Sequence, residues 1–427
     1  MRFRGAGNEV YRISGKHVCP DRPFCGTQTV RHKISMAKKL CIVNNDFSFP
    51  ELPGSLLSSG GKRTLQEQVE EFLGSGRCYL TSCGFAALYL ILKVLKEANP
   101  GKTDVIIPAY TAPGLVLPIR KLGLTVVLCD VSLATFTMDT ARLSRLVTDK
   151  TLAVVPVHMF GIPMDIAGLH KAIGGRAIII EDCAQSLGSE IDGKKTGSLA
   201  DISFGSFGRG KNFSVYHGGF LALRSPALQR EIDAQYASLP ACLFGSQLKT
   251  MVQHSVFSFI TQPSLYGLSS LLTNRLKSKS EQQDFSLSAM GKMHARYAGA
   301  LFGLWCRHYR KRIENGQRLH ARLRDMQGIW VPEYPSRSEI AFNRFPVLVD
   351  DLNAKTKLMR ELAVNGIESS SMYEAPVHCK WDLDYNPKDL PDAEYFAEHL
   401  LTLPTHGLVT EKMINTIGEV FQRILGH

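Results

Sequence analysis

Short apolar runs alternate with helix-like runs from residue 64 onward, and this alternation most narrows the folds open to the chain. Several of the short runs carry Val, Ile, Leu or Ala at nearly every position, at residues 105–108, 126–129, 152–157 and 177–181. Strands that are apolar on both faces belong to sheets covered on both sides, and such sheets are mostly parallel. The sequence therefore predicts an α/β fold, with a central, mostly parallel sheet covered by helices.

Polar side chains close or follow these apolar runs. They are Ser82, Tyr110, Asp130, His158 and Asp182. In open α/β sheets, ligands bind beyond the carboxyl ends of the parallel strands. The sequence therefore predicts a binding site at this edge of the sheet.

Lys211 stands in a glycine-containing segment downstream of Asp182, in the run Ser-Phe-Gly-Arg-Gly-Lys-Asn at residues 206–212. A lysine in such a loop is most often a solvated charge. Its pairing with a carboxylate at the end of a buried strand favours a chemical role. An amine can form a Schiff base, and a carboxylate can keep a pyridine nitrogen protonated. Together they are what pyridoxal 5'-phosphate requires of a protein.

The rest of the chain predicts a smaller second domain and a helical link. Residues 345–349 look like a strand, residues 355–365, 395–401 and 411–425 look like helices, and residues 290–325 look like one long basic helix. We therefore expect four parts: a flexible basic tail (1–40), a large α/β domain (41–230), a helical insertion or linker (231–300), and a small C-terminal α/β domain (301–427).

Residues 250–274 contain no Asp, Glu, Lys or Arg, but Ser, Thr and Gln dilute their apolar content and Pro263 interrupts them. A membrane-spanning helix needs about 20 mainly apolar residues, so this segment is not expected to span a bilayer. Two alternatives stay open. One is a pair of buried or interface helices, and the other is a helical hairpin that makes peripheral contact with a membrane surface.

Charge and cysteine usage exclude some classes of protein. The formal net charge is +11, but Lys and Arg are spread along the chain and no nucleic-acid recognition module accompanies them. We expect no nucleic-acid partner, and instead steering of a phosphate-bearing substrate. The 10 cysteines have irregular spacing, which suits reduced thiols rather than disulfides or a metal site. With no secretory signal evident, we expect a cytoplasmic protein.

A series of motifs in a fixed order resembles the DegT/StrS-type sugar aminotransferases, a branch of the fold-type I pyridoxal phosphate enzymes. The resemblance extends from about residue 55 to the C-terminus. It implies a fold-type I aminotransferase with a large domain and a smaller C-terminal domain. The motifs are SCGFAAL (82–88), IPAYT (107–111), CDV (129–131), PVHMFG (156–161), EDCAQ (181–185), Ser206-Phe207 with Lys211-Asn212, and LPTH (403–406).

The resemblance implies a role for each residue of the cofactor site. Lys211 would form the Schiff base with pyridoxal 5'-phosphate and move the proton at the substrate carbon, and Asp182 would pair with the pyridine nitrogen. Tyr110 would stack on the cofactor ring, with a plain core position as the alternative. The remaining cofactor-binding residues would be Gln185 beside the ring and, around the phosphate, Ser206, Cys83, Gly84 and Phe85.

On the substrate side, the resemblance implies that Tyr373 and His378 face a nucleotide-sugar pocket. His158 is expected near the substrate and cofactor, or else satisfies a strand end as a structural histidine. The amino group would pass, without a metal, from glutamate to a nucleotide-linked keto-sugar. The product would enter surface polysaccharide, lipopolysaccharide or a glycosylated metabolite.

We also expect a homodimer. Departures from the family pattern keep a second function open. Phe85 stands where the family has threonine, and His217 stands where it usually has an acidic residue before the double glycine. The family's Asn-Tyr-Arg motif is not recognisable between residues 240 and 300. The alternative is a catalytically degenerate member that binds the cofactor or a nucleotide-sugar without turnover.

Overall fold

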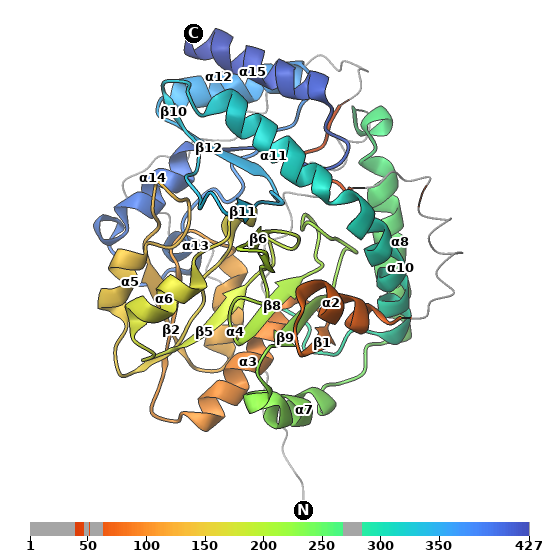
Figure 1. Ribbon diagram of the computed structural model, residues 1–427, viewed down its shortest axis with the longest axis vertical. Coiled ribbons are helices and arrows are strands. Elements are labelled where there is room, and N and C mark those ends of the chain that lie inside the picture. Colours follow the sequence, from red (N-terminus) through yellow and green to blue (C-terminus); the bar gives the residue numbers. More distant parts are fainter. Residues whose placement is uncertain (1–38, 47–50, 52–62, 268–283, 427) are drawn as a thin grey trace, which may run out of the picture.

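The computed structural model describes residues 39–46, 51, 63–267 and 284–426. A seven-stranded sheet lies at the centre of the larger part of the molecule (Figure 1), in the strand order β1-β9-β8-β5-β4-β2-β3. Only β9 runs against its neighbours. The mixed, mostly parallel sheet predicted from the sequence is confirmed. Its strands are β1 (Arg77–Thr81), β2 (Asp104–Pro108), β3 (Thr125–Cys129), β4 (Thr151–Val154), β5 (Ile178–Asp182), β8 (Ile202–Ser206) and β9 (Gly219–Leu223).

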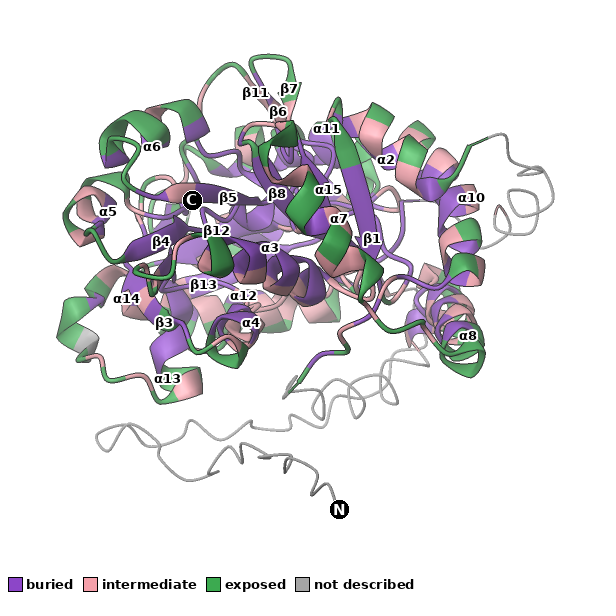
Figure 2. Cartoon of the chain, turned by 90° about the horizontal axis from the view of Figure 1, so that it is seen from below, coloured by how far each residue is buried: buried purple, intermediate pink, exposed green. Residues whose placement is uncertain are grey.

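Helices cover both faces of this sheet, so that its strands are buried between them (Figure 2). Successive residues of β1 and β9 face opposite sides: Tyr79 and Leu221 pack with α3, whereas Leu80 and Phe220 pack with α2 and α10. This alternation is why the strands are apolar at every position. The helices of this part are α2 (Leu65–Leu73), α3 (Gly84–Ala98), η1 (Pro113–Leu115), α4 (Val116–Lys121), α5 (Thr140–Leu146), η2 (Met159–Gly161), α6 (Ile166–Ile173), η3 (Pro226–Leu228) and α7 (Gln229–Ala237).

The C-terminal part is built on a three-stranded antiparallel sheet in the order β10-β12-β13. A second small sheet, in the order β11-β6-β7, joins the two parts of the chain. The elements concerned are β6 (Glu190–Ile191), β7 (Lys194–Lys195), β10 (Ile329–Trp330), β11 (Ser338–Glu339), β12 (Phe345–Val349), α12 (Leu352–Val364), α13 (Val377–Trp381), η4 (Pro387–Asp389), α14 (Pro391–His399), β13 (Leu400–Leu403) and α15 (Glu411–Leu425).

Two helix predictions need correction. The long helix expected over residues 290–325 is two helices, α10 (Lys292–His308) and α11 (Arg310–Leu323), which meet at Tyr309. The change of direction lets α10 pack on α2 and α11 pack on α15 (Figure 1). The helix expected over residues 395–401 ends at His399, because Leu400 and Leu401 pair with β12 as a strand.

The insertion forms helix α8 (Phe244–Ile260), which lies beside α10 (Figure 1). The chain is helical again over residues 263–267, and residues 268–274 of the predicted hairpin lie outside the described residues. No helix in the described ranges combines the length and apolar character that crossing a bilayer requires.

Residues 39–46 pack against the C-terminal part. The Leu40 amide donates to the Gly366 carbonyl (2.7 Å), and His406 Nε2 lies 2.8 Å from the Cys41 carbonyl. Residues 1–38 of the predicted tail lie outside the described residues. The division into four parts stays a prediction.

Candidate active site

Lys211 and Asp182 meet at the centre of the sheet's carboxyl edge. Asp182 is the last residue of β5, and Lys211 lies in the loop that follows the neighbouring strand β8. Among the ion pairs of the described residues, none joins the two within 4.0 Å, yet each affects the pKa of the other. The two groups are thus close enough to interact without forming a direct ion pair.

Burial dominates the titration of both groups. It raises the pKa of Asp182 to about 6, although the charge of Lys211 opposes this. It also lowers the pKa of Lys211, against the stabilising charge of Asp182. A lowered pKa makes the neutral amine more accessible, and only the neutral amine attacks a carbonyl carbon.

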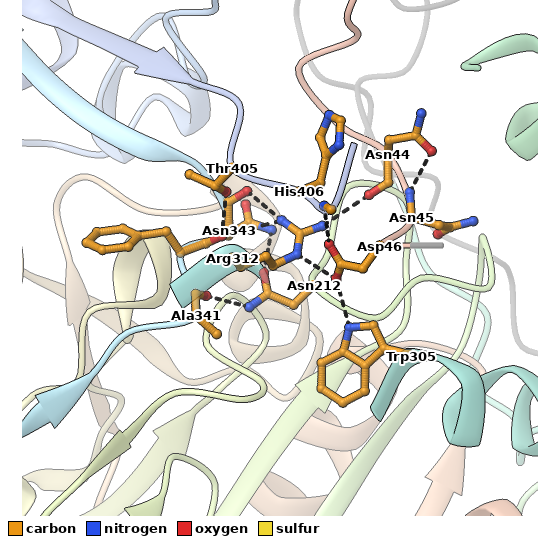
Figure 3. A network of polar contacts seen from close by, with 12 residues as sticks. Asn44, Asn45, Asp46, Asn212, Trp305, Arg312, Ala341, Asn343, Thr405 and His406 are labelled. Carbon is orange, nitrogen blue, oxygen red and sulfur yellow. Dashed lines mark hydrogen bonds and ion pairs between the residues drawn. The ribbon is translucent and has the colours of Figure 1, made fainter. Parts of the chain in front are cut away.

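Asparagine side chains fix the loop on either side of Lys211 (Figure 3). Asn343 Nδ2 donates to the Gly210 carbonyl (2.8 Å) and to Asn212 Oδ1 (3.0 Å). Asn212 Nδ2 in turn donates to the Ala341 carbonyl (2.7 Å). Asn212 and Asn343 are 1% and 3% exposed. The segment just before β12 thus holds both neighbours of the lysine in place.

A buried ion pair anchors this segment from behind (Figure 3). Arg312 Nε donates to Asp46 Oδ2 (2.8 Å), and Nη1 donates to the Asn343 carbonyl (3.1 Å). Trp305 Nε1 also donates to Asp46 Oδ2 (3.0 Å), and the Asn44 carbonyl accepts from Arg312 Nη2 (3.0 Å). Because both charges have several partners, the pair fixes geometry rather than leaving an unmet charge inside the protein.

The N-terminus of α3 packs directly on the end of β8. A Cβ atom on Gly84 would lie 3.2 Å from both the Gly205 carbonyl oxygen and Ser206 Cβ. The N-cap residue, Cys83, makes no side-chain hydrogen bond to the first turn. A helix N-terminus with free N–H groups beside a serine hydroxyl suits a phosphate group. The structure therefore brings Ser206, Cys83 and Gly84 together, and their contact with a cofactor phosphate stays a prediction.

Phe85 contributes only its backbone to this end of the site. Its ring packs against Gly114, where a Cβ atom would lie 2.4 Å from Phe85 Cζ, and its centroid is 6.4 Å from that of Phe285. The ring therefore occupies space between α3 and η1. A threonine at this position would offer a hydroxyl group, whereas Phe85 offers a ring that packs against its neighbours.

Gln185 and Tyr373 meet beside Asp182. Gln185 Nε2 donates to the Tyr373 hydroxyl (3.4 Å), while its Oε1 accepts from the Phe160 amide (3.3 Å). Burial raises the pKa of Tyr373 to about 12, with the charge of Arg344 opposing the rise and that of Asp182 adding to it. The structure thus brings a tyrosine of the C-terminal part to the loop that follows β5.

Tyr110 is enclosed by the C-terminal part. Its ring centroid lies 4.9 Å from that of Phe396 and 5.7 Å from that of Tyr373, and the residue is 1% exposed. Its hydroxyl donates to the Tyr373 carbonyl (3.0 Å) and accepts from the Tyr373 amide (3.2 Å). These contacts favour a core position for Tyr110, and its stacking on a cofactor stays a prediction.

His158 has protein partners at both ring nitrogens. Nε2 lies 2.9 Å from Glu181 Oε1, and Nδ1 accepts from the Met164 amide (3.0 Å). Glu181 also accepts from the Leu199 and Ala200 amides. The geometry favours the structural alternative for His158.

His378 lies on α13, where its Nε2 is 2.9 Å from Glu394 Oε1 of α14. Its ring neighbour is Tyr385, at 6.4 Å between centroids. Its contacts are therefore with the small part of the molecule rather than with the Lys211–Asp182 group. A role in substrate binding stays a prediction for His378.

Arg344 is a member of the site that sequence reasoning missed. It directly precedes β12, and its charge lowers the pKa of Lys211 and of Tyr373. The available signal was a lone arginine at the start of an otherwise apolar strand.

Comparison with known proteins agrees with this geometry. The model of the DegT/DnrJ/EryC1/StrS aminotransferase family matches residues 52–257 and 292–422. The chain belongs to this family. As a DegT-family protein it is an aminotransferase that depends on pyridoxal 5'-phosphate, with the fold-type I architecture expected from the resemblance.

Similar proteins match over most of this DegT-family chain. The UDP-N-acetyl-3-dehydro-alpha-D-glucosamine 3-aminotransferase of Acidithiobacillus ferrooxidans is 28% identical over 85% of this chain and 88% of its own. The spore coat polysaccharide biosynthesis protein SpsC of Bacillus subtilis is 24% identical over 88% of this chain and 92% of its own. A sugar aminotransferase structure from Streptococcus pneumoniae, Spr1654 in its PMP form, superposes with a TM-score of 0.70 at 20% identity, over 91% of this chain and 99% of its own.

The residues of this DegT-family site fit the cofactor. Asp182 is 4% exposed, and within the described residues its carboxylate accepts one hydrogen bond, at Oδ1 from the Ala184 amide (2.8 Å). The other oxygen, Oδ2, is suited to pairing with a protonated ring nitrogen. Lys211 would hold the aldehyde carbon, and Ser206 with the first turn of α3 would hold the phosphate. When bound, the cofactor supplies an electron sink for the carbon that carries the amino group.

Proposed function

We propose that this DegT-family enzyme transfers an amino group from glutamate to a nucleotide-linked keto-sugar. The observation that carries the proposal is the Lys211–Asp182 arrangement at the carboxyl edge of the sheet, in a chain of this family. The name of the relative from Acidithiobacillus supports the substrate class, because that protein acts on a UDP-linked keto-sugar. The net charge of +11 suits a diphosphate-bearing substrate.

The side chains divide the work between them. Asp182 keeps a proton on the ring nitrogen, because a buried carboxylate is stabilised by an adjacent cation. Lys211 Nζ takes the proton from the α-carbon of the donor. In the second half of the reaction it gives a proton to the sugar carbon that receives the amino group. The lowered pKa of Lys211 favours both transfers. Gln185 and Tyr373 close the edge of the site that faces the C-terminal part.

We further propose that the product enters surface polysaccharide, lipopolysaccharide or a glycosylated metabolite, and that the enzyme works in the cytoplasm as a homodimer. The name of SpsC, a polysaccharide biosynthesis protein, supports the first of these. A row of exposed apolar side chains on and before α8 supports a partner surface, because residues four apart share one face of a helix. The row consists of Leu243, Phe244, Leu248, Val252, Val256 and Phe259, which are 48–76% exposed.

The same exposed row also supports an alternative, in which a membrane surface rather than a second subunit covers it through residues 250–274. The sequence from 234 to 280 contains no Asp or Glu, which would favour an anionic lipid surface. Light scattering measures the oligomeric state, and flotation with anionic vesicles measures membrane contact. We expect a dimer that stays at the bottom of the gradient; a monomer that floats would replace the dimer proposal with the membrane one.

Borohydride reduction followed by peptide mass mapping tests the core of the proposal. The cofactor should become fixed to Lys211, and Lys211→Ala should lose both the label and the transfer of nitrogen from glutamate to a panel of keto-sugar nucleotides. Arg209→Ala, in the same loop but exposed, should keep both. A label on another lysine, or transfer that persists in Lys211→Ala, would contradict the proposal.

A further inference from the structure

Three side chains that can bind a metal ion meet between helices α13 and α14. His378 and Cys379 lie on α13, and Glu394 lies on α14. His378 Nε2 is 2.9 Å from Glu394 Oε1, and Cys379 Sγ is 3.5 Å from the same oxygen. One ligand atom from each residue can be chosen so that all three lie within 4.8 Å of one another. In the part of the chain that the structure describes, no other three His, Cys, Asp or Glu side chains gather in this way.

The ring of His378 lacks hydrogen bonds although it is buried. The residue is 4% exposed, and neither ring nitrogen takes part in a hydrogen bond within the described residues. The contact with Glu394 has the distance of an ion pair, but its angle does not suit a bond from a ring N–H. A buried polar group without a hydrogen bond is unfavourable. A metal ion is a partner that the imidazole, the carboxylate and the nearby thiolate can share.

The set of ligand atoms favours zinc. Zinc binds nitrogen, sulfur and oxygen ligands together, whereas magnesium and calcium require oxygen ligands. With bonds of about 2.0–2.3 Å in a tetrahedron, its ligand atoms stand about 3.4–3.6 Å apart. The 2.9 Å and 3.5 Å contacts at Glu394 Oε1 are close to this spacing. Small movements of the three side chains would therefore admit the ion.

The backbones that carry these ligands are already held in place. The amide of the residue before His378 donates to the Ala109 carbonyl (2.8 Å), directly after β2. The amide of the residue before Glu394 donates to Asp130 Oδ1 (2.8 Å), directly after β3. Because the central sheet positions both helices, little order has to be imposed on the ligands when an ion binds.

An ion can reach this position from the solvent. Cys379 is exposed, and the side chain of Glu394 is 16% exposed. The spacing of the cysteines along the sequence favours reduced thiols and gives no sign of a metal site. The reason is that Glu394 joins His378 and Cys379 only through the folding of α14 against its neighbours.

We propose that His378, Cys379 and Glu394 form a zinc site that fastens α13 to α14 and stabilises the C-terminal part. The ion takes an imidazole nitrogen, a thiolate and a carboxylate oxygen from the protein, and a water molecule completes the tetrahedron. Binding releases the thiol proton to the solvent. The role is structural, because the ligands contact α13 and α14 rather than the Lys211–Asp182 group. In this role His378 is a metal ligand, not the substrate contact that the resemblance implies.

Zinc binding to the holoenzyme is measured by equilibrium dialysis against buffered free zinc, followed by metal analysis. We expect one ion per chain in the wild type. Cys379→Ser and Glu394→Gln should each weaken binding by about 100-fold or more, because even the loss of an outer partner of a ligand costs 10- to 100-fold. X-ray absorption of the zinc-loaded holoenzyme should show one sulfur at about 2.3 Å and nitrogen or oxygen at about 2.0–2.1 Å.

Thermal melting tests the stabilising role. At free zinc 100 times its dissociation constant, the melting temperature of the wild type should rise by about 3 °C in a chain of this length. Cys379→Ser should show no rise, and magnesium should give none with the wild type. Cys242→Ser is the control, since this half-buried cysteine lies outside the group. It should bind zinc and respond to it as the wild type does.

Four results would overturn the inference. They are a wild-type protein that holds no zinc at micromolar free zinc, an unchanged affinity in Cys379→Ser or Glu394→Gln, an absorption spectrum without a sulfur neighbour, and binding without a rise in melting temperature. None of these measurements involves amino transfer. A negative result would therefore leave the proposed function standing.

Discussion

Replacing Asp182 with asparagine should stabilise the cofactor-free protein while it removes most of the activity. Asp182 is 4% exposed, and its Oδ1 accepts a hydrogen bond from the Ala184 amide (2.8 Å). An asparagine amide oxygen can accept the same bond, so the substitution removes the charge and little else. The cofactor needs that charge, but the folded protein without cofactor must bury it.

The pKa of Asp182 gives the size and the pH range of the effect. The carboxyl group titrates near 3.8 in the unfolded chain and at about 6 in the folded protein, and this difference corresponds to about 3 kcal/mol. Between these values the unfolded chain loses its proton first, so raising the pH destabilises the folded state. The loss of folding stability caused by the buried Asp182 charge is absent below pH 3.8 and complete above about pH 6. Because the value of about 6 already includes the attraction of Lys211, we expect a net gain of up to about 3 kcal/mol for Asp182→Asn at pH 7.5.

Urea unfolding of the cofactor-free wild type and Asp182→Asn between pH 4 and 8 measures the difference in their free energies of unfolding. The control is Asp201→Asn, which removes a carboxylate whose side chain is 70% exposed and should change stability by less than about 0.5 kcal/mol. Added cofactor should reverse the order, because ligand binding stabilises the wild type more. The reasoning fails if Asp182→Asn is the less stable protein at pH 7.5, or if its advantage is as large at pH 4.

Three further predictions concern the support of the site and its surroundings. Asn343→Ala should destabilise the protein by about 2–4 kcal/mol, since it leaves the Gly210 carbonyl and Asn212 Oδ1 without their donor; a drop in turnover without a shift of the urea midpoint would contradict this. Gly114→Ala should destabilise by about 1–3 kcal/mol through the clash with Phe85, and Phe85→Leu should recover much of the loss in thermal melting of the double variant. Leu248→Glu with Val252→Glu should convert the proposed dimer to a monomer in light scattering at unchanged melting temperature; a dimer that persists would place the interface elsewhere.

Strands β2, β3, β4 and β5 could be predicted because each is a short apolar run, whereas β8 and β9 were not predicted. β2 and β12 are apolar at almost every position and are bounded by polar residues, so their ends are fixed locally. Tyr309 carries no such signal. It has helical backbone angles (φ −58°, ψ −25°) between two helical patterns, and the bend there is set by packing against α2 and α15. The sequence around Leu400 fits a helix or a strand equally, because a short apolar run forms a strand only when a partner strand is present.

The site divides in the same way. Lys211 and Asp182 could be found because their order along the chain follows the order of the strands. Arg344 could not, because its place depends on Asn343 reaching across to Gly210 and Asn212, a contact between distant parts of the sequence. The role of His158 does not follow from the sequence, because the fold alone sets the position of Glu181 relative to its ring.

The molecule contains two groups of charges that are fully or partly buried, and they differ in how many hydrogen bonds they make. Arg312 and Asp46 form an ion pair, and Arg312 also donates to the carbonyl of Asn343, the residue that holds the lysine loop (Figure 3). Lys211, Asp182 and Arg344 make fewer side-chain hydrogen bonds within the described residues, and burial shifts the pKa of each. An under-partnered charge would relax toward water or another side chain if its backbone could move. The Arg312–Asp46 pair prevents that movement, so the charges at the carboxyl edge stay available until a ligand binds them.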